Sequence, residues 1–69
     1  MDVGKRVREI RNERSLSQDA LAKRADVART TVARLEAGEV SPTVSMLEKL
    51  ANALGVEPEE LIRDPLGVA

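Results

Sequence analysis

The sequence predicts a small all-α domain built from five short helices, and three observations support this prediction. Apolar residues recur at intervals of three and four along most of the chain, which is the spacing of one face of an α-helix. No segment alternates apolar and polar residues for long enough to form a β-strand. The chain has 69 residues, which is enough for a single domain with a small core.

The first two helices are predicted from apolar spacing and from polar residues at their ends. The first helix has three apolar residues on one face: Val3, Val7 and Ile10. Ser15 is expected to end it. A second helix is expected to begin after Ser17, because a serine side chain can accept a hydrogen bond from the free N–H groups of a helix start. This second helix directs three apolar residues toward the core: Leu21, Ala22 and Ala25.

A third helix is expected from about Ala28 to Ala37, with Val32 and Leu35 facing inward. A short turn at residues 26–27 precedes it. Gly38 is expected to end it, because glycine readily adopts the left-handed conformation that closes many helices. The second and third helices would therefore be separated only by a tight turn.

A fourth helix is predicted to open at Ser41 and Pro42, with the serine as cap and the proline in the first turn. Its buried stripe is expected to contain Val44, Leu47, Leu50, Ala51 and Leu54. Gly55 is expected to close it. Pro58, Glu59 and Glu60 begin a short fifth helix around Leu61 and Ile62, which Asp64 and Pro65 should end. Residues 1–63 are thus expected to form the domain, and residues 64–69 a tail or a truncated linker.

The composition excludes several classes of function. The chain has no Cys and no His, so it lacks disulfides, the thiolate and imidazole ligands of most zinc sites and the commonest general base. Glu59 and Glu60 are adjacent and would point in different directions on a helix, so they do not form a catalytic pair. We expect no enzymatic activity, no metal and no cofactor.

Hydropathy predicts a protein without a membrane anchor. No apolar run approaches the roughly 18 residues of a membrane span. Met1 is followed by Asp-Val-Gly instead of a basic and then apolar leader. We therefore expect a cytoplasmic protein.

The charge is divided unevenly along the chain. Residues 1–34 hold nine Lys and Arg against five acids, a net charge of +4, and residues 35–69 hold two against seven, a net charge of −5. Such a division would orient the first half toward a polyanion, although segregation of surface charge by chance is the alternative. The chain has no aromatic residue on which single-stranded bases could stack. If the polyanion is a nucleic acid, a duplex is therefore expected.

Two short helices joined by a tight turn, from Gln18 to Leu35, are typical of a helix-turn-helix. The sequence here resembles the Cro and phage-repressor family, also called the xenobiotic response element family. The resemblance extends over residues 5–63 and rests on Leu16-Ser17-Gln18, Leu21-Ala22, Val27, Thr31-Val32, Glu36, Gly38, Pro42, Leu47, Leu50-Ala51, Ala53-Leu54-Gly55-Val56 and Leu61. It implies a compact five-helix lambda-repressor-like domain that binds double-stranded DNA at a specific sequence and regulates transcription as a repressor, with the third helix in the major groove.

The resemblance also implies which residues meet the DNA. Base contacts are expected from the outward face of the third helix: Arg29, Thr30 and Arg34. Arginine reads guanine through two hydrogen bonds, and a threonine offers a hydroxyl or a methyl group. Contacts with the DNA backbone are expected from Arg11, Ser17, Gln18, Thr31 and Ser41. Arg11 and Glu36 match positions that often form an ion pair in this family.

Four residues depart from the family pattern. Ser15 and Asp26 stand where glycines are usual, Ala28 replaces a Ser or Thr cap, and Glu39 stands where many relatives are basic. Aspartate can adopt the left-handed conformation, so we expect the turn at Asp26 to form at some energetic cost. Ala28 should weaken the start of the third helix by about 0.5–2 kcal/mol. These departures predict a modest affinity for DNA in a single domain.

The expected partner is a DNA operator with an inverted repeat, bound by a homodimer. One recognition helix contacts only a few base pairs, so two copies are needed to select a site in a genome. The region after the fourth helix offers four apolar residues for self-association: Val56, Ile62, Leu66 and Val68. The alternative is that Val56 and Ile62 only complete the core. A role as an interaction module, with a toxin or an effector as partner, is a second reading that the sequence leaves open.

Overall fold

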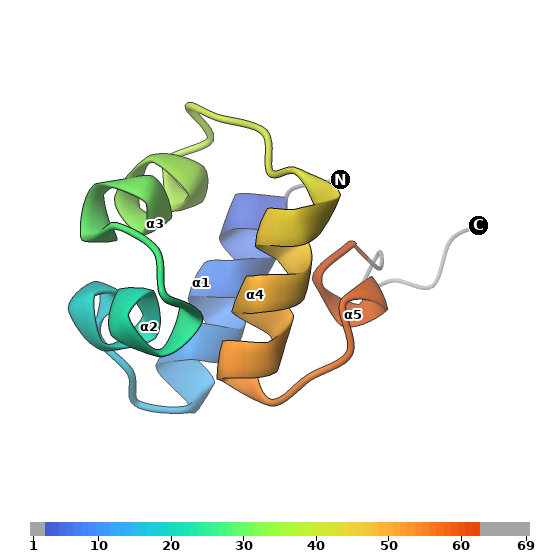
Figure 1. Cartoon of the computed structure of the whole chain (residues 1–69). Coiled ribbons are helices and arrows are strands. Elements are labelled where there is room, and N and C mark those ends of the chain that lie inside the picture. The colour runs from blue at the N-terminus through green and yellow to red at the C-terminus, as the bar shows by residue number, and fades with distance from the viewer. Residues whose placement is uncertain (1–2, 63–69) are drawn as a thin grey trace.

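A computed structural model describes residues 3–62 of the chain. Figure 1 shows the described helices, which are α1 (Val3–Glu13), α2 (Gln18–Ala25), α3 (Arg29–Glu36), α4 (Val44–Leu54) and α5 (Glu59–Ile62). α1 and α4 run through the middle of the molecule, with α2 and α3 on one side and α5 on the other (Figure 1). The described residues contain no strand, which confirms the all-α prediction.

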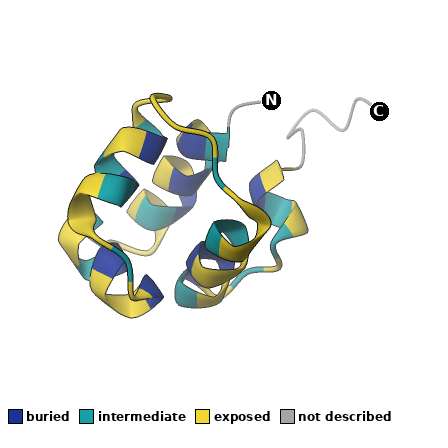
Figure 2. Ribbon diagram, turned by 45° about the horizontal axis from the view of Figure 1, so that its top comes forward, coloured by how far each residue is buried: buried dark blue, intermediate teal, exposed yellow. Residues whose placement is uncertain are grey.

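The core lies where the helices face one another, as the burial colours in Figure 2 show. All five helices contribute buried apolar residues, which are Val7, Ile10, Leu21, Ala22, Ala25, Val32, Leu35, Leu50, Ala51, Leu54 and Leu61. Val3 and Leu47 are partly buried against this cluster. The predicted apolar faces of the first, second and third helices are therefore confirmed.

The start of α4 corrects the sequence-based prediction. The N-cap is Thr43, and its Oγ1 accepts a hydrogen bond of 3.1 Å from the backbone N–H of Met46. Ser41 and Pro42 lie in the loop before the cap, so neither begins the helix. Because the helix starts later than expected, Val44 is its first residue and is 74% exposed instead of buried.

The other described helix ends lie within one or two residues of the prediction, and the largest of these differences is at α1, which ends at Glu13, two residues before Ser15. The hydroxyl oxygen of Ser17 accepts a hydrogen bond of 3.0 Å from the N–H of Ala20 and caps α2. α3 begins at Arg29, with Ala28 as a cap that has no side-chain hydrogen bond. Gly38 follows α3 with a φ of +78°, and Gly55 ends α4 in the left-handed conformation.

Among the residues that the structure describes, two that are not glycine adopt the left-handed backbone conformation that usually favours glycine. They are Ser15, with a φ of 56° after α1, and Asp26, with a φ of 58° after α2. Asp26 ends α2, and its N–H group bonds carbonyl oxygens of the last turn. These are two of the positions where the sequence departs from the family, and the turns form as expected.

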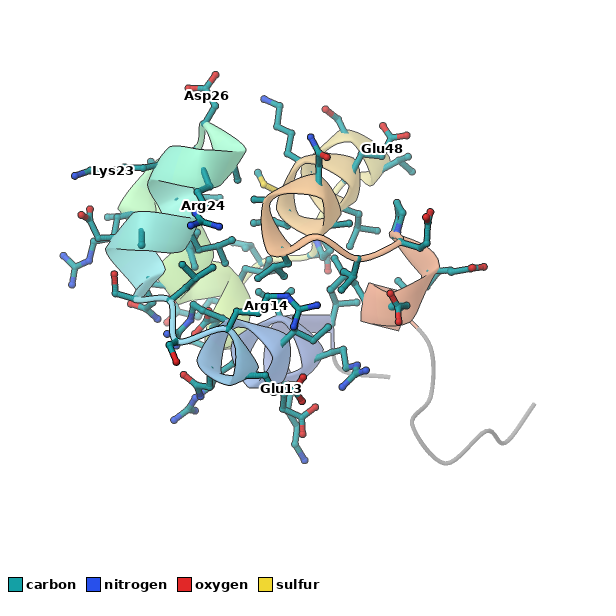
Figure 3. The ribbon with its side chains drawn as sticks, turned by 90° about the horizontal axis from the view of Figure 1, so that it is seen from below. Glu13, Arg14, Lys23, Arg24, Asp26 and Glu48 are labelled. Atoms are coloured by element: carbon teal, nitrogen blue, oxygen red, sulfur yellow. The ribbon has the colours of Figure 1, made fainter. Side chains whose placement is uncertain are left out.

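Two arginines of α1 hold the carboxyl-terminal helices in place. The Nε of Arg6 donates to the carbonyl oxygen of Glu60 at 3.2 Å, and the Nε of Arg14 donates to that of Leu54 at 2.5 Å. Leu61 is fully buried beside them. Figure 3 shows Arg14 reaching from α1 toward α4. The predicted end of the fifth helix at Asp64 and Pro65, and the predicted tail at 64–69, lie outside the described residues.

Candidate nucleic-acid interface

The face of α3 that points away from the core carries exposed polar side chains. Val32 and Leu35 are buried, which fixes the rotation of the helix about its axis. The exposed residues on the other side are Arg29, Thr30 and Arg34, and Thr31 is half-buried. The structure therefore presents the three predicted base-contacting residues together on one helix.

The position of α3 depends on a contact with Gly4 that the sequence analysis did not identify. Gly4 is buried in α1, and a Cβ atom added there would overlap the carbonyl oxygen of Leu35. The backbones of α1 and α3 can therefore approach each other only because residue 4 has no side chain. An isolated glycine within a helical pattern was the available signal.

Arg11 and Glu36 form the expected ion pair between α1 and α3. The Nε of Arg11 donates to Oε2 of Glu36 at 2.7 Å, and Nη2 donates to Oε1 at 3.0 Å. The side chains are only 12% and 4% exposed, so water screens this pair less than a surface pair. The hydrogen bond from Arg11 to Glu36 raises the pKa of Arg11. Arg11 remains charged, and its third contact is a bond of 2.7 Å from Nη1 to the carbonyl oxygen of Leu16.

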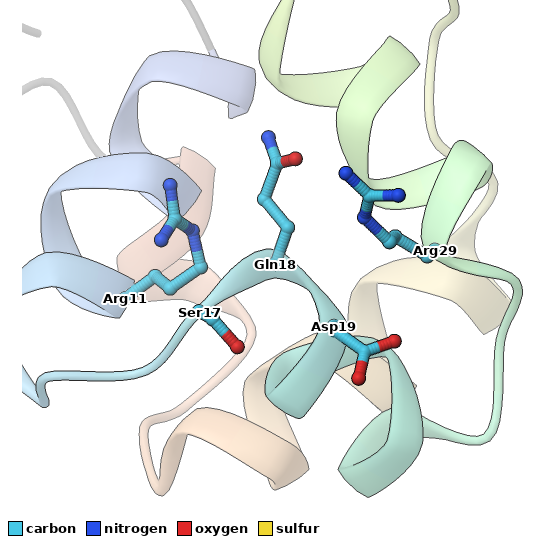
Figure 4. Close-up of a pocket in the computed structure, with 5 residues that line it drawn as sticks. All are labelled: Arg11, Ser17, Gln18, Asp19 and Arg29. Carbon is cyan, nitrogen blue, oxygen red and sulfur yellow. The ribbon is translucent and has the colours of Figure 1, made fainter.

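Gln18 extends this network at the start of α2. Its Nε2 donates to Oε1 of Glu36 at 3.1 Å, so one carboxylate binds both Arg11 and Gln18. Figure 4 shows Gln18 between Arg11 and Arg29. These three residues, with Ser17 and Asp19, line an open hollow of about 460 Å³. The hollow joins the amino terminus of α2 to the first residue of α3.

Four of the five predicted backbone-contacting residues fall into two groups in space, and the fifth, Thr31, is half-buried on α3. Arg11, Ser17 and Gln18 lie together around this hollow. Ser41 lies apart from it, exposed in the loop after α3, where it lines a separate hollow of about 190 Å³ with Gly4 and Leu35. If both groups contact one DNA molecule, the first would do so near the start of α3 and Ser41 would do so beyond its end.

Asp19 is an acidic member of the hollow that the sequence analysis did not assign to the site. Its Oδ2 lies 3.4 Å from Nζ of Lys23, one helical turn further along α2. Both side chains are more than half exposed. This pair places a carboxylate on the same surface as Arg29.

Three arginines of α1 are engaged in contacts within the fold. Arg6 and Arg14 bond carbonyl oxygens of the carboxyl-terminal helices, and Arg11 is paired with Glu36.

Among residues 3–62, no group of three or more His, Cys, Asp or Glu is placed to hold a metal ion. None of the helices within that range is long and apolar enough to cross a membrane.

Two short helices joined by a tight turn, with the second presenting an exposed polar face, are the arrangement found in helix-turn-helix domains. The sequence profile of the helix-turn-helix family (HTH_3) matches residues 7–61, and the chain belongs to this family. The resemblance to the Cro and phage-repressor family is therefore confirmed.

Two curated relatives are similar to most of the chain. The immunity repressor protein of Bacillus phage phi105 is 39% identical over 62 residues, which are 90% of this chain and 43% of the repressor. The control protein C.BamHI of Bacillus amyloliquefaciens is 38% identical over 60 residues, which are 86% of this chain and 74% of that protein. The chain thus spans less than half the length of the phage repressor.

Two solved structures share the fold. The restriction-modification controller protein C.AhdI of Aeromonas hydrophila has a TM-score of 0.85 and 38% identity, covering 87% of this chain and 91% of that one. The DNA-binding domain of the P22 c2 repressor has a TM-score of 0.88 and 29% identity, covering 96% of this chain and 87% of that one. The expected lambda-repressor-like fold is confirmed.

Proposed function

We propose that this domain binds a specific sequence in double-stranded DNA and represses transcription, with α3 lying in the major groove. The observation that supports this most directly is the geometry of α3. Its buried residues hold it on the core, while its exposed residues, Arg29, Thr30 and Arg34, project from the other side. The major groove of B-DNA is wide enough to admit an α-helix presented in this way.

The bases would be read by the exposed side chains of α3. Arg29 and Arg34 can each donate two hydrogen bonds to O6 and N7 of guanine, and each such pair gives about 1–3 kcal/mol of discrimination. Thr30 can offer its hydroxyl to a base edge or its methyl group to thymine. Arg29 and Arg34 are separated by more than one helical turn, so they would contact different base pairs.

The DNA backbone would be held by groups on either side of α3. At the start of α2, the free N–H groups and the amide of Gln18 suit a phosphate. The Ser17 hydroxyl oxygen accepts from Ala20, and its proton is available to an acceptor. Thr31 and Ser41 would contact phosphates near α3, and Arg11 would act mainly by orienting Gln18 through Glu36.

Repression is supported by the relatives, among which are phage repressors. A protein bound to an operator excludes other proteins from that DNA, so binding alone is sufficient for this role. We propose no catalytic activity, since the relatives are named as repressors, control proteins and transcriptional regulators. The proposed target, genomic DNA, would place the protein in the cytoplasm.

The proposed functional form is a homodimer on an inverted repeat. Ile62 of α5 is 39% exposed, whereas Val56 is partly buried against the core. The other two residues named for self-association, Leu66 and Val68, lie outside the described residues. Two-fold symmetry would place the two copies of α3 about 34 Å apart, one turn of the DNA.

Sedimentation of the protein with an inverted-repeat duplex tests this dimer. Two chains should bind each duplex, and Ile62→Glu should reduce the cooperativity of binding while a single half-site is still bound. Asn52→Glu adds the same charge at an exposed position on α4 and should leave cooperativity unchanged. A one-to-one complex on a site without symmetry would contradict the dimer.

Selection of binding sites from random duplex DNA tests the proposed function itself. We expect enrichment of one motif made of two inverted half-sites, each containing guanine. Binding to that motif should weaken steeply between low and physiological salt, since counterions are released from the contacted phosphates. Failure to enrich any sequence would contradict sequence-specific binding.

A further inference from the structure

A second hollow lies beside the first, between α1 and the carboxyl-terminal half of α3. It has a volume of about 310 Å³ and is lined by Arg8, Arg11, Gln18, Ala33, Glu36 and Ala37. Because Arg11 and Gln18 line both hollows, the two form a continuous surface from the start of α2 to the end of α3. A DNA strand that passes Gln18 would therefore continue over this second hollow.

The charges of Arg11 and Glu36 cancel within that surface. Glu36 accepts two hydrogen bonds from Arg11 and one from Gln18. Arg11 donates a further hydrogen bond to the carbonyl oxygen of Leu16. Both charged side chains are nearly buried. Arg11 therefore adds little net positive charge to the hollow, although it was expected to contact the DNA backbone.

Arg8 is the other cation of the second hollow, and it is exposed. It lies nearly one helical turn before Arg11 on α1, so both project toward the same side. Within residues 3–62, no ion pair or hydrogen bond engages its side chain, whereas Arg6, Arg11 and Arg14 are each engaged. Arg8 consequently supplies the net positive charge of the hollow.

The rest of the lining leaves room for a phosphate group. Ala33 and Ala37 belong to α3 and its cap, and neither has a side chain beyond Cβ. Arg34, in the last turn of α3, does not line this hollow, and the residues after Glu36 (Ala37, Gly38 and Glu39) carry no positive charge. A cation that holds a phosphate there must therefore come from another element, and Arg8 of α1 is placed to do so.

We propose that Arg8 binds a backbone phosphate of the DNA in this hollow. This inference rests on the proposed function, since it concerns the DNA bound by α3. An arginine that contacts only a phosphate carries no sequence information. Its contribution should be equal for all duplexes and should depend on salt.

The test compares wild-type protein with Arg8→Gln in titrations of two labelled duplexes, the selected motif and an unrelated sequence, at several salt concentrations. Arg8→Gln should bind both duplexes more weakly by the same factor, about tenfold at low salt. The slope of log affinity against log salt should become shallower by about 0.9, the value for one phosphate. Arg8→Lys, which keeps the charge, should retain most of the wild-type slope.

Arg24→Gln is the matched control, because Arg24 is exposed at the carboxyl end of α2, away from Gln18. It should retain the wild-type slope, and thermal unfolding should confirm that both variants are folded. If wild-type protein binds the motif and Arg8→Gln keeps the wild-type dependence of affinity on salt, the proposed phosphate contact of Arg8 is wrong. If wild-type protein binds neither duplex, the proposed function is wrong instead.

Discussion

Gly4 in α1 lies directly against the carbonyl oxygen of Leu35 in α3, with no room for a Cβ atom between them. Leu35 is itself buried in the core, so both sides of this contact are fixed. The opposite face of the same helix carries Arg34 and the other exposed side chains proposed to read DNA. The direction in which α3 faces is therefore set partly by a backbone contact with the first turn of the molecule.

Gly4→Ala is expected to destabilise the fold, because the added methyl group must displace backbone atoms of α3. Overpacking of this kind costs about 1–3 kcal/mol, and a backbone neighbour places the effect at the upper end of that range. Urea unfolding would measure it. Asn12→Ala, at an exposed position of the same helix, should leave the free energy of unfolding within about 0.5 kcal/mol of wild type. An equally stable Gly4→Ala variant would show that α1 and α3 can separate without cost.

Glu36→Ala should lower the free energy of unfolding by about 2 kcal/mol or more. Breaking a buried pair costs roughly 3–5 kcal/mol, and Arg11 regains some contact with water here. Asp19→Ala breaks the exposed pair with Lys23 and should cost no more than about 0.5 kcal/mol. Equal losses in the two variants would mean that burial does not strengthen the Arg11–Glu36 pair.

The same pair predicts little dependence of stability on pH from Arg11. Hydrogen bonding to Glu36 raises the pKa of Arg11 in the folded state. A raised pKa contributes stability that is fully present below the pKa of the unfolded chain and is lost as pH rises through the folded value. Both values lie far above neutral pH, so the destabilisation caused by Arg11→Met should be the same at about pH 7 and pH 9.

Ala28→Ser should stabilise the protein, since α3 begins at a cap without a side-chain hydrogen bond. The backbone of Ala28 already has the extended conformation of a cap, with φ of −72° and ψ of 144°. A serine hydroxyl there can accept from a free N–H group and should add about 0.5–2 kcal/mol to the free energy of unfolding. Thermal unfolding of the two proteins provides the comparison, and an unchanged midpoint would argue against it.

Arg34→Ala and Gln18→Ala should change DNA binding in different ways. Loss of Arg34 should relax the preference for one base pair in each half-site, because its proposed contact is with a base. Loss of Gln18 should weaken binding to all sequences alike, because its proposed contact is with the backbone. Site selection repeated with each variant distinguishes the two roles, and an unaltered motif for Arg34→Ala would remove Arg34 from the base-reading set.

Local sequence signals predicted most of the fold because they depend on neighbouring residues. Ser17 caps α2, and Ser15 and Asp26 adopt the left-handed conformation where the family usually has glycine. The prediction failed at α4, where two hydroxyl groups, Ser41 and Thr43, competed for the same role. Thr43 is the cap, whereas the sequence analysis assigned that role to Ser41 because Pro42 follows it.

The site was less predictable, because it depends on contacts between distant segments. Gly4 and Leu35 are 31 positions apart, and an isolated glycine in a helical pattern does not reveal which distant residue approaches it. The role of Arg8 becomes visible only when Glu36 is seen to engage both Arg11 and Gln18. The sequence shows which residues are arginines that could contact DNA. Only the structure shows which of these arginines already bind a partner within the protein.

Leu61 belongs to a helix of four residues, yet it is fully buried in the core. A helix of that length has no stability of its own, so α5 exists only because the core holds it. The core in turn loses one of its largest buried side chains if α5 is removed. The helix-turn-helix formed by α2 and α3 therefore cannot be transferred to another protein by itself. The transferred segment would have to run from Val3 to Leu61.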